Sequence, residues 1–137
     1  MYKKLINTIE KENINYINHK LYSTKGMIAH YNDITAIVVD DKQITSQTDE
    51  NTVLLQELGH YSAGAYYRSA SPFELIEKME YKADKTAWEK FIPYQKVLSL
   101  MRIGFTTVTD LAEYFNIDAP YMARCINYYY NQYRFNY

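Results

Sequence analysis

The amino-acid sequence predicts an α+β fold with a small antiparallel sheet and about five helices. Two short β-prone runs lie at 27–31 and 35–39, and much of the remaining chain shows helical spacing of apolar residues between capping signals. At 137 residues, the chain is long enough to bury a hydrophobic core without disulfide or metal support. We therefore expect one domain, with an N-terminal helix in 1–25, a core in 26–103 and a helical, tyrosine-rich tail in 104–137.

The N-terminal part of the chain predicts one helix followed by a β-hairpin. Through residues 1–21, apolar side chains recur at helical spacing, at Leu5, Ile9, Ile14 and Ile17. The two β-prone runs that follow are separated by Asn32 and Asp33, which are residue types that favour tight turns. We therefore expect an amphipathic helix and then an antiparallel hairpin that ends at Asp40.

A polar stretch precedes the first long helix. Residues 45–51 are rich in residue types that cap helices, and either Thr48 or Asp49 is suited to be the N-cap. Gly64 then marks the end of the helix, because glycine readily adopts the left-handed conformation that closes helices.

A second long helix is predicted to follow. Ser71 and Pro72 stand at its start, with Glu74 three residues after the serine, which is the pattern of a capping box. The helix should cover residues 72–91 and end before Pro93, which cannot continue a helix.

Three shorter helices complete the expected fold. The first should cover residues 93–102 and stop at Gly104. Thr109 is the expected cap of the second, residues 116–118 form a turn, and Pro120 opens a last helix that continues to about residue 130.

The candidate functional residues lie in the first long helix, in the segment QELGH. Residues three or four apart share a helix face, so Gln56, Glu57 and His60 point the same way. This face is one residue away from the H-E-x-x-H pattern, in which two histidines bind zinc and the glutamate between them is the general base. Gln56 stands at the first ligand position. The alternative interpretation is an exposed glutamate and a solvated histidine with no metal.

The second long helix carries acidic and small residues along one line. Glu80, Asp84 and Ala87 recur at helical spacing, beside Ala83. Small side chains allow a neighbouring helix to come close, and that neighbour is expected to be the helix that carries His60. Asp84 lies one turn after Glu80, so its carboxylate is a candidate to complete a metal site with His60 and Glu80.

Composition excludes several classes of protein. The chain has 15 basic and 16 acidic residues and a formal charge of −1, which argues against direct binding of nucleic acid. The helix–turn–helix outline at 109–130 has only Arg124 as a cation, too few to face phosphates. The single Cys125 excludes an internal disulfide and favours a reducing, cytoplasmic compartment. We expect no membrane segment, because no apolar run is long enough.

Tyrosine is unusually common, with 16 residues that crowd toward the C-terminus at Tyr121, Tyr128, Tyr129, Tyr130, Tyr133 and Tyr137. Such residues have a large contact area and a polar tip, so the cluster is either the edge of the core or a surface that binds a partner.

The order of these features resembles the ImmA/IrrE family of metallo-endopeptidases, known from phages and integrative elements. The hairpin, the segment LLQELGHY at 54–61 and the segment EYKADKTAWEKFIP at 80–93 carry the resemblance, which covers roughly residues 26–130. It implies a compact zincin-like fold, a cytoplasmic location in a bacterial host and cleavage of a helix–turn–helix repressor that silences a mobile element.

The resemblance also implies a role for each motif residue. Glu57 matches the general base, His60 the second zinc ligand and Glu80 the third ligand, whereas Gln56 replaces the first ligand with a neutral carboxamide, a weaker donor to zinc. Two functions follow from the resemblance: a metal-dependent endopeptidase, or a catalytically degenerate module of the same fold that binds a repressor or host regulator without cutting it. A third, weaker hypothesis is a DNA-binding regulator that uses residues 109–130.

Overall fold

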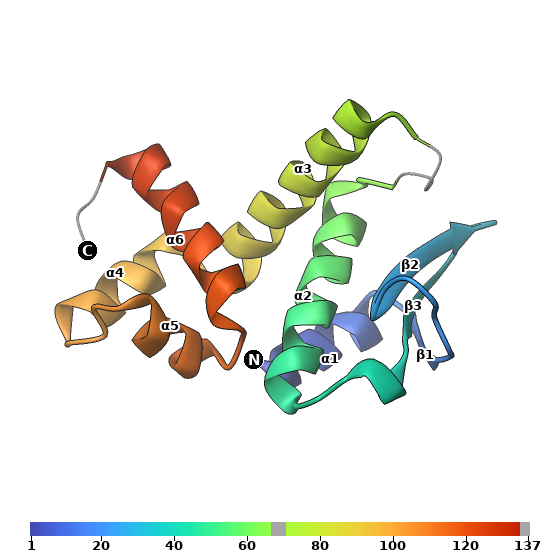
Figure 1. The fold of residues 1–137 in the computed structure, drawn as a ribbon, viewed down its shortest axis with the longest axis horizontal. Coiled ribbons are helices and arrows are strands. Elements are labelled where there is room, and N and C mark those ends of the chain that lie inside the picture. The colour runs from blue at the N-terminus through green and yellow to red at the C-terminus, as the bar shows by residue number, and fades with distance from the viewer. Residues whose placement is uncertain (67–70, 135–137) are drawn as a thin grey trace.

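Six α-helices and a three-stranded sheet form the computed structural model, which describes residues 1–66 and 71–134 (Figure 1). This confirms the predicted α+β class. The elements in chain order are α1 (Tyr2–Lys11), β1 (Asn15–Asn18), β2 (Gly26–Tyr31), β3 (Ile34–Val39), the 3₁₀ turn η1 (Asp41–Gln43), α2 (Gln47–Ala63), α3 (Phe73–Phe91), α4 (Tyr94–Arg102), α5 (Val108–Phe115) and α6 (Ala119–Tyr133).

The predicted hairpin is confirmed. Strands β2 and β3 pair antiparallel, with Tyr31 opposite Ile34, and only Asn32 and Asp33 lie between them. Both turn residues have positive φ angles, 49° and 63°. A two-residue turn of this kind matches the right-handed twist of the strands, and asparagine and aspartate tolerate the left-handed conformation that it needs.

The N-terminal helix is shorter than predicted, and the sheet is mixed rather than wholly antiparallel. Helix α1 ends at Lys11, and Asn13 takes a left-handed φ of 55° that turns the chain. Residues Asn15–Asn18 then form β1, which pairs parallel with β3, so the strand order is β1-β3-β2. Asparagine in this segment stops the helix because it adopts left-handed conformations more readily than most residues.

Two helix caps lie two to three residues earlier in the sequence than predicted. Ser46, rather than Thr48 or Asp49, caps α2 and accepts a hydrogen bond from the backbone N–H of Asp49. Thr107, rather than Thr109, caps α5. In both helices the side chain of the N-cap residue accepts a hydrogen bond from the backbone N–H three residues later. The cap therefore stands earlier in the polar stretch than the predicted residue.

Helix α3 lacks the predicted capping box. It begins at Phe73, Pro72 occupies the N-cap position, and no side chain caps the helix there. The predicted helix ends are confirmed: Gly64 closes α2 with a φ of 61°, α3 ends at Phe91 before Pro93, and Asn116 closes α5.

Helix α2 is central in the fold and lies between the sheet and α3 (Figure 1). Its apolar face is completely buried at Leu54, Leu55 and Leu58. Trp88 and Cys125 are also buried. No helix in the part of the chain that the structure describes is long and apolar enough to cross a membrane.

Candidate active site

Helices α2 and α3 approach each other so closely that their backbones almost touch at Gly59. A Cβ atom on Gly59 would lie 2.5 Å from the carbonyl oxygen of Ala83 and 3.0 Å from the Cβ of Ala87. The expectation that the small residues of α3 pack against the helix that carries His60 is therefore confirmed. This contact places Glu80, which lies one turn before Ala83, beside His60.

The imidazole of His60 links the two helices. Its side chain is buried, with the residue 7 % exposed, and its Nε2 lies 3.2 Å from Oε1 of Glu80. On the other side, Nδ1 lies 2.7 Å from the carbonyl oxygen of Ala65, which can only accept a hydrogen bond, so Nδ1 carries a proton. Ala65 stands directly after the glycine that ends α2. The close of the helix therefore fixes the orientation of the ring and directs Nε2 toward Glu80.

The charges around His60 change its acidity and that of Glu57. Burial acts to lower the pKa of His60, but the hydrogen bonds to Glu80 and to the Ala65 carbonyl, together with the negative charges of Glu80 and Glu57, raise it to about 9. Burial raises the pKa of Glu57 to about 7, with the charge of His60 opposing this rise and that of Glu80 adding to it. Glu57, His60 and Glu80 thus form one electrostatic group.

The edge of the sheet passes over Glu57. Strand β2 is an edge strand, and a Cβ on its first residue, Gly26, would lie 2.5 Å from Cγ1 of Val53 and 3.7 Å from Cγ of Glu57. Glycine at this position allows the strand to lie against α2. As a result, Glu57 is partly buried and lies next to a strand whose outer edge pairs with no other strand in the described part of the chain.

Asp84 is held by a different partner. Its buried carboxylate lies 3.3 Å from the guanidinium of Arg124, which comes from α6 and stacks over the ring of Tyr121 at 5.3 Å. Burial raises the pKa of Asp84 to about 6, against the opposing charge of Arg124. The ion pair ties α3 to α6, one turn beyond Glu80.

The fit of a metal to these residues is partial. His60 and Glu80 offer the nitrogen and oxygen donors that zinc takes, and the hydrogen bond at Nδ1 is the arrangement that orients metal-binding histidines. Gln56 is partly exposed on α2, one turn before His60. Among the described residues, however, no group of three or more His, Cys, Asp and Glu side chains is arranged to hold a metal ion. His60 and Glu80 thus lie together, and ligation of a metal by His60, Glu80, Gln56 and Asp84 stays a prediction.

Several features of the site have weak or no signals in the sequence. The Ala65 carbonyl has none, because any residue supplies one. Gly26 is an isolated glycine at the start of a β-prone run, a pattern that often marks close approach of two backbones. His30 is exposed, and its ring stacks on that of Tyr66 at a distance of 5.5 Å between the ring centres.

Comparison with known proteins finds no matching family model, no matching curated protein and no matching solved structure. The indications of function are therefore the site residues themselves and the resemblance of the segments at 54–61 and 80–93 to ImmA/IrrE motifs.

Proposed function

We propose that the protein is a metal-dependent endopeptidase of the ImmA/IrrE type, with a zincin-like arrangement of its sheet and helices. One observation carries the proposal: the contact of α2 with α3 buries His60 and brings its Nε2 within 3.2 Å of the Glu80 carboxylate, on the helix face that also carries Glu57. A buried histidine paired with a partly exposed carboxylate is not needed to fill the core, which is well supplied with apolar residues. Clusters of coupled ionisable side chains with shifted pKa values are typical of functional sites.

The proposed site would hold a divalent cation, zinc being the candidate, through His60 and Glu80, with the Gln56 carboxamide as a weak additional donor. When bound, the ion would supply Lewis-acid chemistry and lower the pKa of a water molecule. Glu57 would act as the general base, and its pKa of about 7 suits proton transfer near neutral pH. The Ala65 carbonyl keeps the His60 ring in position.

We propose that the peptide substrate binds along the outer edge of β2, which pairs with no other strand in the described part of the chain. An extended peptide can add to an exposed strand through main-chain hydrogen bonds, and this strand begins beside Glu57. A peptide bound there would pass the general base. The proposed substrate is a helix–turn–helix repressor of a phage or mobile element, in the cytoplasm of a bacterial host, as the motif resemblance implies.

A cleavage assay tests this function. Purified protein with added zinc is incubated with helix–turn–helix repressors from the same genome, and the products are resolved by mass spectrometry. We expect cleavage at one or a few peptide bonds that a chelator abolishes. The variant Glu57→Gln should lose cleavage, whereas the control Glu113→Gln, at an exposed position on α5, should cleave as the parent does. Cleavage that survives in Glu57→Gln would overturn the role of this residue.

The second candidate function is a binding module that captures a repressor or host regulator without cutting it. Two observations favour it: Gln56 at the first ligand position, and the lack of a three-residue metal cluster among the described side chains. Under this function, repressor binding measured by calorimetry is the same for the parent and for Glu57→Gln, and neither protein yields fragments.

A further inference from the structure

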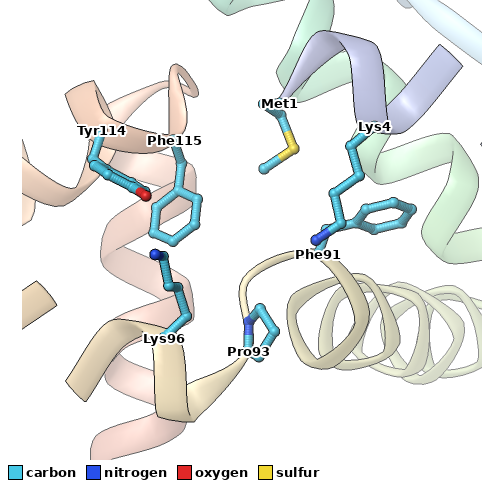
Figure 2. Close-up of a pocket in the computed structure, with 7 residues that line it drawn as sticks. All are labelled: Met1, Lys4, Phe91, Pro93, Lys96, Tyr114 and Phe115. Atoms are coloured by element: carbon cyan, nitrogen blue, oxygen red, sulfur yellow. The ribbon is translucent and has the colours of Figure 1, made fainter. Parts of the chain in front are cut away.

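A second site lies at the opposite end of α3, where the chain turns into α4. A cavity of about 420 Å³ opens there between α1, the α3–α4 corner and α5 (Figure 2). Its lining consists of Met1, Lys4, Phe91, Pro93, Lys96, Tyr114 and Phe115. Phe91 follows Glu80 by 11 residues on the same helix, which corresponds to about 16 Å along its axis. The cavity is therefore separate from the candidate active site.

The walls of this cavity are mainly apolar and aromatic. Phe91 and Phe115 are buried and belong to the main core, so they provide a fixed base. Tyr114 is 44 % exposed, and its ring is available at the rim. Rings of this kind pack well against flat, apolar groups.

Two lysine side chains stand on opposite sides of the cavity. Figure 2 shows Lys4 reaching down from α1 beside Phe91 and Lys96 reaching up from α4 toward Tyr114 and Phe115, so the two ammonium groups lie on different sides of the cavity. The Nζ of Lys4 lies 5.9 Å from the centre of the Phe91 ring, and the Nζ of Lys96 lies 5.3 Å from that of Tyr114. Aromatic faces attract cations, which helps to hold the ammonium groups over the cavity.

No carboxylate neutralises these two lysines within the residues that the structure describes. The ion pairs found there join Lys25 to Asp49, His60 to Glu80 and Arg124 to Asp84. The lining itself contains no acidic residue. The cavity therefore combines an aromatic wall with two positive charges that form no ion pair among residues 1–66 and 71–134.

We propose that this cavity binds a small molecule that carries an anionic group, phosphate or carboxylate, on a flat ring. The ammonium groups of Lys4 and Lys96 would bind the anion as point charges, while Tyr114 and Phe115 would contact the ring. The volume lies within the range of small-molecule sites. No sheet edge borders the cavity, so an extended peptide has no strand to pair with there. The proposal does not depend on the endopeptidase function.

Binding of defined probes to the complete chain tests the proposal. The probes are phenyl phosphate and adenosine monophosphate, with inorganic phosphate and adenosine as controls that lack the ring or the charge, measured by calorimetry and by saturation-transfer NMR. We expect both ring phosphates to bind at least about tenfold more tightly than either control, because the two parts of the ligand contribute together. Tighter binding of adenosine monophosphate would identify a nucleotide, and tighter binding of phenyl phosphate an aryl acid.

Variants of the lysines assign the binding to this cavity. The double variant Lys4→Gln, Lys96→Gln should weaken ring-phosphate binding at least about tenfold and leave adenosine unchanged, since only the charges are removed. Lys90→Gln is the matched control, because its Nζ also lies over the Phe91 ring, at 5.4 Å, but Lys90 does not line the cavity. Circular dichroism verifies that each variant is folded.

Three results would overturn the proposal. They are the absence of ring-phosphate binding at millimolar concentration, equal binding by the parent and the double variant, and tighter binding of the acidic peptide Asp-Tyr-Glu, capped at both ends, than of phenyl phosphate. The last result would make the cavity a contact site for a protein partner.

Discussion

The α2–α3 pair and the α5–α6 pair are built in opposite ways. Helices α2 and α3 meet through small residues, with Gly59 against Ala83, and they enclose ionisable side chains beside that contact. Helices α5 and α6 instead contribute large apolar side chains to the core, including Leu111, Phe115, Met122 and Ile126. Burial of a histidine or a carboxylate costs stability unless the group is paired. In these four helices the buried residues of this kind, His60 and Asp84, both belong to the α2–α3 pair, which makes that pair the candidate functional region.

The largest expected effect on stability concerns the α5–α6 pair, which contributes large apolar side chains to the core. Leu111 is fully buried, and Leu111→Ala should lower the free energy of unfolding by about 2–5 kcal/mol, because it removes contacts and leaves a cavity. Urea titration followed by Trp88 fluorescence and by far-UV circular dichroism measures the change. The two signals should coincide in the parent and in the variant, since Trp88 and Leu111 belong to the same core. Two separate transitions would show that the tail folds independently.

The next effect concerns the close contact of α2 with α3. In Gly59→Ala, the new methyl group would meet the Ala83 carbonyl at 2.5 Å, and a backbone atom cannot move aside easily. We expect a loss of about 1–3 kcal/mol in the free energy of unfolding, measured by the same urea titration. Gly26→Ala is the matched variant, because its methyl group would also lie at 2.5 Å, but from the end of the Val53 side chain, which can rotate. Gly26→Ala should therefore lower the free energy of unfolding by less than Gly59→Ala does. Equal costs would contradict the rigid contact.

A third prediction concerns the metal donors of the α2–α3 pair. Gln56→His restores the H-E-x-x-H pattern and replaces a neutral carboxamide with an imidazole, which is a better donor to zinc. We expect zinc affinity to rise by roughly tenfold or more, measured by competition with a chromogenic chelator. The control is Gln47→His, at the start of the same helix, about two and a half turns before Gln56. If both variants raise the affinity equally, the new histidine binds zinc without the proposed site.

The smallest effect compares the helix caps of the two regions. Ser46 caps α2 and Thr107 caps α5, each through one hydrogen bond of 3.0 Å to a backbone N–H. Ser46→Ala and Thr107→Ala should each cost about 1 kcal/mol of unfolding free energy, because each leaves one N–H without its side-chain partner. Thermal unfolding of the two variants in parallel measures the costs. A clearly larger cost at Ser46 would mean that the cap also supports the candidate site.

The parts of the fold that the sequence predicted correctly depend on short local patterns, such as turn residues and helix-ending glycines. The hairpin followed from Asn32 and Asp33, whose side chains suit a tight turn, and the end of α2 followed from Gly64. The contact of α2 with α3 was also readable, because a line of alanines at helical spacing leaves room only for a close neighbour. Strand β1 was missed, since it forms only through parallel pairing with β3, and its four residues carry no strand pattern of their own.

The candidate site was predictable only to the extent that helical spacing defines it. Spacing placed Glu57 and His60 on one face and Glu80 on the facing helix, and these residues lie together. The hydrogen bond from His60 to the Ala65 carbonyl depends on how α2 ends. The pairing of Asp84 with Arg124 depends on how α6 crosses α3, and a sequence does not reveal a contact between residues 40 positions apart. Tyr137 of the tyrosine cluster lies outside the described residues.

The central claim is that His60 and Glu80, brought together by α2 and α3, hold a metal ion. The most direct measurement is the zinc content of protein purified without chelator and then dialysed against a small excess of zinc, alongside the variants His60→Ala and Glu80→Gln. If His60 and Glu80 hold the metal, the parent contains near-stoichiometric zinc and both folded variants lose it. A folded parent that takes up no zinc, or zinc uptake that is unchanged in the variants, would contradict it.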